Sequence, residues 1–126
     1  MFTARKSEIS DIGKIFIISF LGCSSCLELY VNGSFHGYSE GSHNTAEFNI
    51  TDKLGKGENE IVVVVHKWCN GTYLEAQDMF RLPGIFRTVA LYSVPKVYVR
   101  DLVAIPDLDV TYTDGSLAIS ADVCNL

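Results

Sequence analysis

The segment with the densest chemistry is the stretch at residues 73–81, which holds two carboxylates, an amide, an arginine and two aromatic rings. Its carboxylates, Glu75 and Asp78, stand three positions apart. Such a pair can act as acid and base on a glycosidic bond, but the acid needs a pKa raised by burial in a cleft. No pattern in this sequence indicates that either carboxyl group is buried in a cleft. The residues alone favour a polar loop tied down by Arg81.

Cysteines and histidines give weaker signals. Cys23 and Cys26 form a C-x-x-C pair. A zinc site would require a second ligand pair at similar spacing, and a thioredoxin-like redox motif would stand at the start of a helix. An alternating strand pattern follows instead, so we predict ordinary buried or strand-end thiols and leave open whether the two pair. His36, His43 and His66 are too scattered in the sequence to predict a metal site, and we predict no Ser-His-Asp triad.

The elements that must position these residues are strands and turns. One face of residues 27–31 is fully apolar, and Asn32-Gly33 follows as the pair favoured in a two-residue hairpin turn, because both positions tolerate positive φ. Short strands separated by turn residues indicate an all-β, jelly-roll-like sandwich. The predicted strands are 14–21, 27–31, 34–39, 60–67, 85–93, 97–105 and 116–123, with 14–21 and 60–67 as buried strands.

Composition excludes several classes of function. A net charge of −5 argues against binding nucleic acid, which requires a basic surface. No apolar run approaches the roughly 18 residues of a membrane helix. No signal peptide is visible, because Glu8 and Asp11 precede any apolar run, and this favours the cytoplasm. The stretch 70–84 lacks strand signal, and loops of that length are usually functional.

A series of short motifs resembles the sugar-binding domain of glycoside hydrolase family 2, specifically that of its β-galactosidases. The longest motif is Gln-Asp-Met-Phe-Arg-Leu-Pro-Gly-Ile-Phe-Arg at 77–87, and shorter ones stand at 29–33, 37–42, 46–52, 57–59 and 71–75. The resemblance covers about residues 13–92. It implies a galactose-binding-domain-like jelly roll at 1–94 that lacks the earlier half of the family's domain. Pro95 and Pro106 bracket a change of composition, and 95–126 is similar to the opening strands of the immunoglobulin-like domain that follows in the family.

The resemblance also implies a function. The parent enzyme hydrolyses terminal β-galactosides with retention, through two glutamates on a TIM barrel that this chain lacks, so the chain alone is expected to be inactive. Asp78 carries over as the residue that contacts a sugar hydroxyl and ligates sodium, with the other sodium ligands supplied by the barrel. Sodium and magnesium are implied for the parent only. The chain departs from the family pattern at Ala76, Phe80, Pro83 and Thr88, and the first two put the sugar preference in question.

Two other functions remain open from the sequence, a free-standing carbohydrate-binding module and a structural or oligomer-forming sandwich. Binding modules usually present several aromatic platforms, whereas Trp68 is the one tryptophan. We expect Tyr73 and Phe80 to pack in the core rather than flank a sugar. Because the resemblance implies missing strands, we expect 14–21 and 60–67 to lack neighbours and the chain to self-associate.

Overall fold

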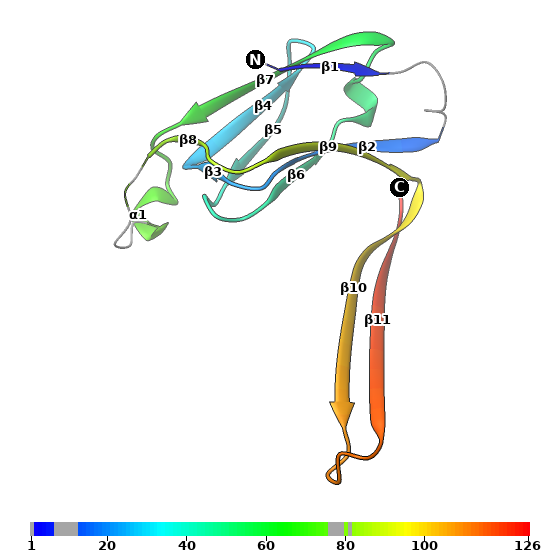
Figure 1. Ribbon diagram of the computed structural model, residues 1–126. Helices are drawn as coiled ribbons and strands as arrows, with labels where there is room; N and C mark the ends of the chain where they lie inside the picture. The colour runs from blue at the N-terminus through cyan, green and yellow to red at the C-terminus, as the bar shows by residue number, and fades with distance from the viewer. Residues whose placement is uncertain (1, 7–12, 76–79, 81) are drawn as a thin grey trace. The chain divides into compact units, whose positions relative to one another are not determined.

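The computed structural model describes residues 2–6, 13–75, 80 and 82–126, and most of these residues lie in strands (Figure 1). The chain divides into two compact units, Met1–Ser93 and Val94–Leu126. Among the residues so described, no helix is long and apolar enough to cross a membrane.

The first unit contains a four-stranded antiparallel sheet. Its strand order is β1-β7-β4-β5. Register pairs such as Leu29 with Val63 and Glu28 with Tyr38 hold β4 between its two neighbours. The strands are β1 (Phe2–Lys6), β7 (Gly57–His66), β4 (Cys26–Val31) and β5 (Ser34–Glu40).

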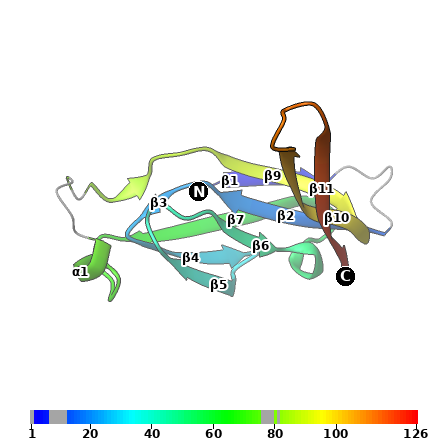
Figure 2. The same cartoon turned by 90° about the horizontal axis from the view of Figure 1, so that it is seen from below.

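A second layer faces this sheet (Figures 1 and 2). It is a three-stranded sheet with the order β6-β2-β9, and a short pair, β3 with β8, lies beside it. The 3-10 helix η1 (Thr51–Lys53) and the four-residue helix α1 (Thr72–Glu75) are the helical elements among the described residues. The strands of this layer are β6 (Ala46–Asn49), β2 (Lys14–Phe20), β9 (Val89–Pro95), β3 (Cys23–Ser24) and β8 (Gly84–Ile85).

The core of the first unit lies between these two layers. Phe20 of β2 and Leu29 of β4 are fully buried, and the Phe20 ring meets the Phe48 ring edge-on with their centroids 6.2 Å apart. Ile50 closes the core from the segment before η1. Apolar side chains from both inner faces therefore fill one interior, as in other β-sandwiches.

The turn at Asn32-Gly33 is confirmed. Both residues have positive φ, 50° and 76°, as a two-residue hairpin requires. The Asn32 side chain also stabilises its surroundings, since Nδ2 donates to the Lys53 carbonyl at 2.8 Å and Oδ1 accepts from the Glu60 amide at 2.9 Å.

The second unit is a single antiparallel hairpin of β10 (Val97–Leu108) and β11 (Gly115–Asn125). A bulge interrupts its register between Val99 and Asp101. No residue of 94–126 is buried.

The all-β sandwich is confirmed, but several details of the sequence prediction are wrong. The run 85–93 is two strands, β8 and β9, rather than one. The run Val62–Val65 is not a buried strand, because Val64 stands on the open face of its sheet and is 39% exposed. Neighbours are also present: β2 lies between β6 and β9, and β7 pairs with β1 along 57–61 and with β4 along 61–66.

Candidate functional site

Asp78, the predicted substrate and sodium ligand, lies outside the described residues, and so does Arg81. The structure does describe both chain segments that lead to Asp78, namely 67–75 before it and 82–88 after it. We refer to these two segments and their contacts as the framework on either side of Asp78.

The framework begins at the turn that leads into α1. The Cys69 amide donates to Oγ1 of Thr72 at 2.9 Å, and the Thr72 amide donates back to the Cys69 carbonyl at 3.1 Å. Thr72 is buried. This reciprocal pair satisfies backbone groups that a short helix would otherwise leave without partners, so four residues suffice to form α1.

Glu75 fastens α1 to the loop at 41–44. Its carboxylate accepts the Ser42 amide, at 3.1 Å to Oε2 and 3.2 Å to Oε1, and the Ser42 hydroxyl at 2.6 Å. Ser42 is itself buried. A carboxylate held in this way positions the chain, and an acid/base role for Glu75 with Asp78 finds no support in this geometry.

A second carboxylate, Glu40 of β5, holds the same segment from another side. It accepts the Gly71 amide at 3.2 Å and the Tyr38 hydroxyl at 2.5 Å. A Cβ at Gly71 would stand 3.2 Å from Oε2 of Glu40, so glycine is the residue that fits most easily here. The hydrogen bond to Glu40 raises the pKa of Tyr38, so this phenol stays protonated and keeps donating.

The segment after Asp78 returns to the same loop. Nη1 of Arg87 donates to the carbonyls of Leu21 and His43, at 3.4 and 3.3 Å. The Phe86 ring lies 5.6 Å from the His43 ring, between centroids. Because Glu75 binds Ser42 and Arg87 binds His43, adjacent residues of one loop support both ends of the segment that carries Asp78.

Exposed apolar side chains border this framework, which corrects a sequence prediction. Tyr73 is 86% exposed and Phe80 is 96% exposed, so neither packs in the core. The reason for Tyr73 is that α1 is a single turn that buries Thr72, partly buries Glu75 and leaves Tyr73 and Leu74 exposed. Trp68, Leu74 and Leu82 are exposed as well.

Neither a metal site nor a disulfide is assembled by the described residues. They contain no group of three or more histidine, cysteine or acidic side chains that could hold a metal ion. All four cysteines are free thiols, and Cys23 and Cys26 are buried at strand ends, as predicted. His66 pairs with Glu28 at 3.3 Å.

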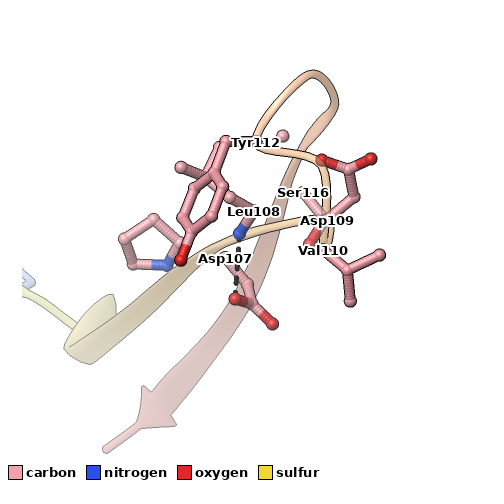
Figure 3. A pocket seen from close by; sticks show the side chains of 8 residues that line it. Asp107, Leu108, Asp109, Val110, Tyr112 and Ser116 are labelled. Atoms are coloured by element: carbon pink, nitrogen blue, oxygen red, sulfur yellow. Dashed lines mark hydrogen bonds between the residues drawn. The ribbon is translucent and has the colours of Figure 1, made fainter.

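The second unit has a depression at the tip of its hairpin (Figure 3). Asp109 organises it by accepting the amides of Thr113 and Asp114, at 2.7 and 3.2 Å, and the Thr111 hydroxyl. These bonds are internal to the turn and hold its backbone in place.

Comparison with known proteins gives concordant results. Residues 3–95 match the family described as glycosyl hydrolases family 2, sugar binding domain. The β-galactosidase of Priestia megaterium (strain DSM 319 / IMG 1521) is 48% identical over 120 residues, which cover 95% of this chain and 11% of that protein. The β-galactosidase of Vibrio vulnificus (strain YJ016) is 49% identical over 102 residues, or 81% of this chain and 10% of that protein. The chain thus spans about a tenth of these relatives.

Solved structures agree on the fold. An FMN-binding β-glucuronidase from Facaelibacterium prausnitzii L2-6 superposes with a TM-score of 0.85 at 23% identity, covering 98% of this chain and 20% of that one. A β-glucuronidase from Bacteroides uniformis gives a TM-score of 0.82 at 20% identity, covering 97% and 15%. Identities this low establish the fold alone.

Proposed function

The chain belongs to glycoside hydrolase family 2, and from this premise we propose that it is the non-catalytic sugar-binding domain of a β-galactosidase, followed by the first strands of the next domain. One observation carries the proposal: the β-galactosidase of Priestia megaterium is 48% identical over 95% of the chain. The longer protein would hydrolyse terminal β-galactosides in the cytoplasm, with its catalytic residues beyond this chain.

Within that enzyme, Asp78 is the residue that reaches the substrate. Glu75, the other carboxylate of the segment, accepts hydrogen bonds from Ser42, and this supports the assignment of the ligand-facing role to Asp78. A carboxylate accepts hydrogen bonds from sugar hydroxyls and also ligates hard cations. The sodium ion implied by the family would take Asp78 as one ligand and its remaining ligands from a TIM barrel, as would any magnesium from residues outside this chain.

The same barrel is the partner that would cover the exposed apolar residues beside the framework. Tyr73, Phe80 and Leu82 project from the two segments that flank Asp78. Exposed apolar side chains that form a contiguous patch mark an interaction site. Burial of these side chains would set the position of Asp78 relative to the catalytic residues.

A chimera tests the proposal. The chain replaces the matching 120 residues of the Priestia megaterium β-galactosidase, and hydrolysis of a chromogenic β-galactoside is measured. We expect an active chimera, and a loss of roughly 30- to 1000-fold in kcat/KM for Asp78→Ala, because one charged partner of the transition state is removed. The 126-residue chain alone should show no turnover.

The matched control is Asp52→Ala, which removes an exposed carboxylate in η1 and should leave kcat/KM unchanged. Full activity of the Asp78→Ala chimera would refute the role of Asp78. Turnover by the isolated chain that survives repurification would refute its non-catalytic nature.

A free-standing carbohydrate-binding module remains the second candidate, because Trp68 is 61% exposed and could stack on a sugar. Calorimetric titration of the isolated chain with galactose separates the two. A Kd below about 1 mM, near −4 kcal/mol, would favour the module.

A further inference from the structure

Cys26 is buried on the side of β4 that faces away from the core. Strand residues alternate between faces, and Leu27, Leu29 and Val31 are the ones that pack in the core. On the opposite face, Glu28 is partly exposed, whereas Cys26 is buried. Another part of the chain must therefore cover the Cys26 thiol.

The cover is the segment 67–71. The hydroxyl of Ser25 donates to the Lys67 carbonyl at 2.8 Å, which fixes the start of this segment beside β4. The Gly71 amide donates to Glu40 at 3.2 Å, which fixes its end over β5. Since Cys26 pairs in register with His66 of β7 and with Glu40 of β5, the segment crosses from one neighbour of Cys26 to the other.

Cys69 lies in the middle of this crossing. Its sulfur is 3.8 Å from the position that a Cβ of Gly71 would take, and Glu40 Oε2 is 3.2 Å from the same position. The Cys69 sulfur also lies 3.5 Å from Oγ1 of Thr72, and, in addition to burial, the charge of a Cys69 thiolate would raise the pKa of the Cys26 thiol. The segment that carries Cys69 thus crosses the outer face of the sheet at the strand position of Cys26.

We propose that Cys26 and Cys69 are a redox pair that closes reversibly to a disulfide and so locks the framework before Asp78 onto β4. The proposal rests on the geometry of this chain and is independent of the proposed function. Low-molecular-weight disulfides such as oxidised glutathione are the oxidant it requires.

The chemistry proceeds in two exchange steps. The Cys69 thiol is partly exposed, so its thiolate attacks one sulfur of the small disulfide, whose S–S bond breaks and releases one thiol that takes up a proton. Burial raises the pKa of the Cys26 thiol. Cys26 then loses its proton and attacks Cys69, and the second small thiol leaves with that proton. Two protein thiols are oxidised and one small disulfide is reduced to two thiols.

The other two cysteines provide internal controls. Cys23 belongs to the core cluster on the inner side of the sandwich. Cys124 lies in the second unit, in register with Tyr98.

The test is oxidation of the reduced 126-residue chain with oxidised glutathione. We expect the intact mass to fall by two hydrogens, titratable thiols to fall from four to two, and peptide mapping to link Cys26 with Cys69. The melting temperature should rise by roughly 5–15 °C, since a loop of this length is closed in the unfolded chain. Dithiothreitol should reverse all of these changes.

Cysteine variants distinguish a Cys26–Cys69 disulfide from other pairings of the four thiols. Cys23→Ser with Cys124→Ser should still lose two hydrogens, whereas Cys69→Ser and Cys26→Ser should not. Melting of each reduced variant reports whether it folds, and the partly exposed Cys69→Ser is the safest of them. A link between Cys23 and Cys26, glutathione adducts that never resolve, or crosslinking between chains would each overturn the proposal.

Discussion

The units Met1–Ser93 and Val94–Leu126 are both built from antiparallel strands rich in β-branched residues, yet only the first buries side chains. Leu29 on β4 has no exposed surface, whereas Leu117 on β11 is 60% exposed. Both leucines stand in regular, paired strands. The strand pattern therefore determines pairing, and burial depends on whether a second layer covers the strand.

The physical reason lies in the number of layers. In the first unit, sheets of four and three strands each turn one face inward, and their side chains share one core. A two-stranded hairpin has two faces and nothing in its own unit to cover either of them. Such a hairpin is at best marginally stable by itself.

The largest effect on stability is expected when one leucine in each unit is truncated to alanine, which compares the closed core with the open hairpin. Leu29→Ala leaves a cavity in a closed core and should lower the free energy of unfolding by about 2–5 kcal/mol. Leu117→Ala removes surface that is already in water and should change it by less than about 0.5 kcal/mol. Urea denaturation of both variants measures the two values. Equal losses would mean that the hairpin contributes to a core after all.

Self-association should come from the hairpin rather than from the sandwich. By the alternation of the strands, Leu102 and Ile119 stand on one face of the hairpin, and both are exposed. We expect the chain to associate through this face and Leu102→Lys with Ile119→Lys to weaken association at least about tenfold, or 1.4 kcal/mol. Light scattering across a dilution series measures it.

The matched control is Val64→Lys, which adds a charge to the open face of β7 in the first unit and should change association little. If Val64→Lys is the variant that yields monomers, the chain associates through the sandwich, and the assignment of self-association to the hairpin is wrong. A chain that is monomeric at all concentrations would remove the prediction of self-association itself.

The fold could be predicted where local chemistry decides it. Asn32-Gly33 specifies its turn because only residues that tolerate positive φ fit there. The strands β1 and β6 were not predicted, because Phe2–Lys6 and Ala46–Asn49 are short and at least half polar and gain their structure from neighbours distant in sequence. The break between β8 and β9 likewise depends on Arg87, which binds carbonyls of Leu21 and His43.

The candidate site was less predictable for the same reason. The role of Glu75 depends on Ser42, 33 positions earlier, and no spacing rule joins them. The exposure of Tyr73 and Phe80 depends on whether another part of the fold packs against them, and the local sequence does not specify such a contact. The role of Asp78 rests on motif resemblance, which transfers a chemical role without its geometry, and it stays a prediction.

The smallest expected effect is a response to acid confined to the hairpin tip. Hydrogen bonds from the Thr111 hydroxyl and then from the backbone amide of Thr113 hold the pKa of Asp109 below its ordinary value. Because the folded pKa is the lower one, these bonds stabilise the turn above the unfolded value of about 3.9 and are lost as the pH falls through the folded pKa.

Backbone NMR checks this loss between about pH 6 and about pH 2, a range that brackets the titration of an aspartate. The Thr113 and Asp114 amides should shift with a midpoint below the ordinary aspartate value, while the amide of Leu29 in the closed core stays constant. Asp109→Asn keeps an oxygen acceptor and removes the titration, so its turn amides should not respond with that midpoint. A wild-type midpoint at or above the ordinary value would mean that these bonds do not favour the charged carboxylate of Asp109. The polar network would then not explain how the hairpin tip differs from the strands that it joins.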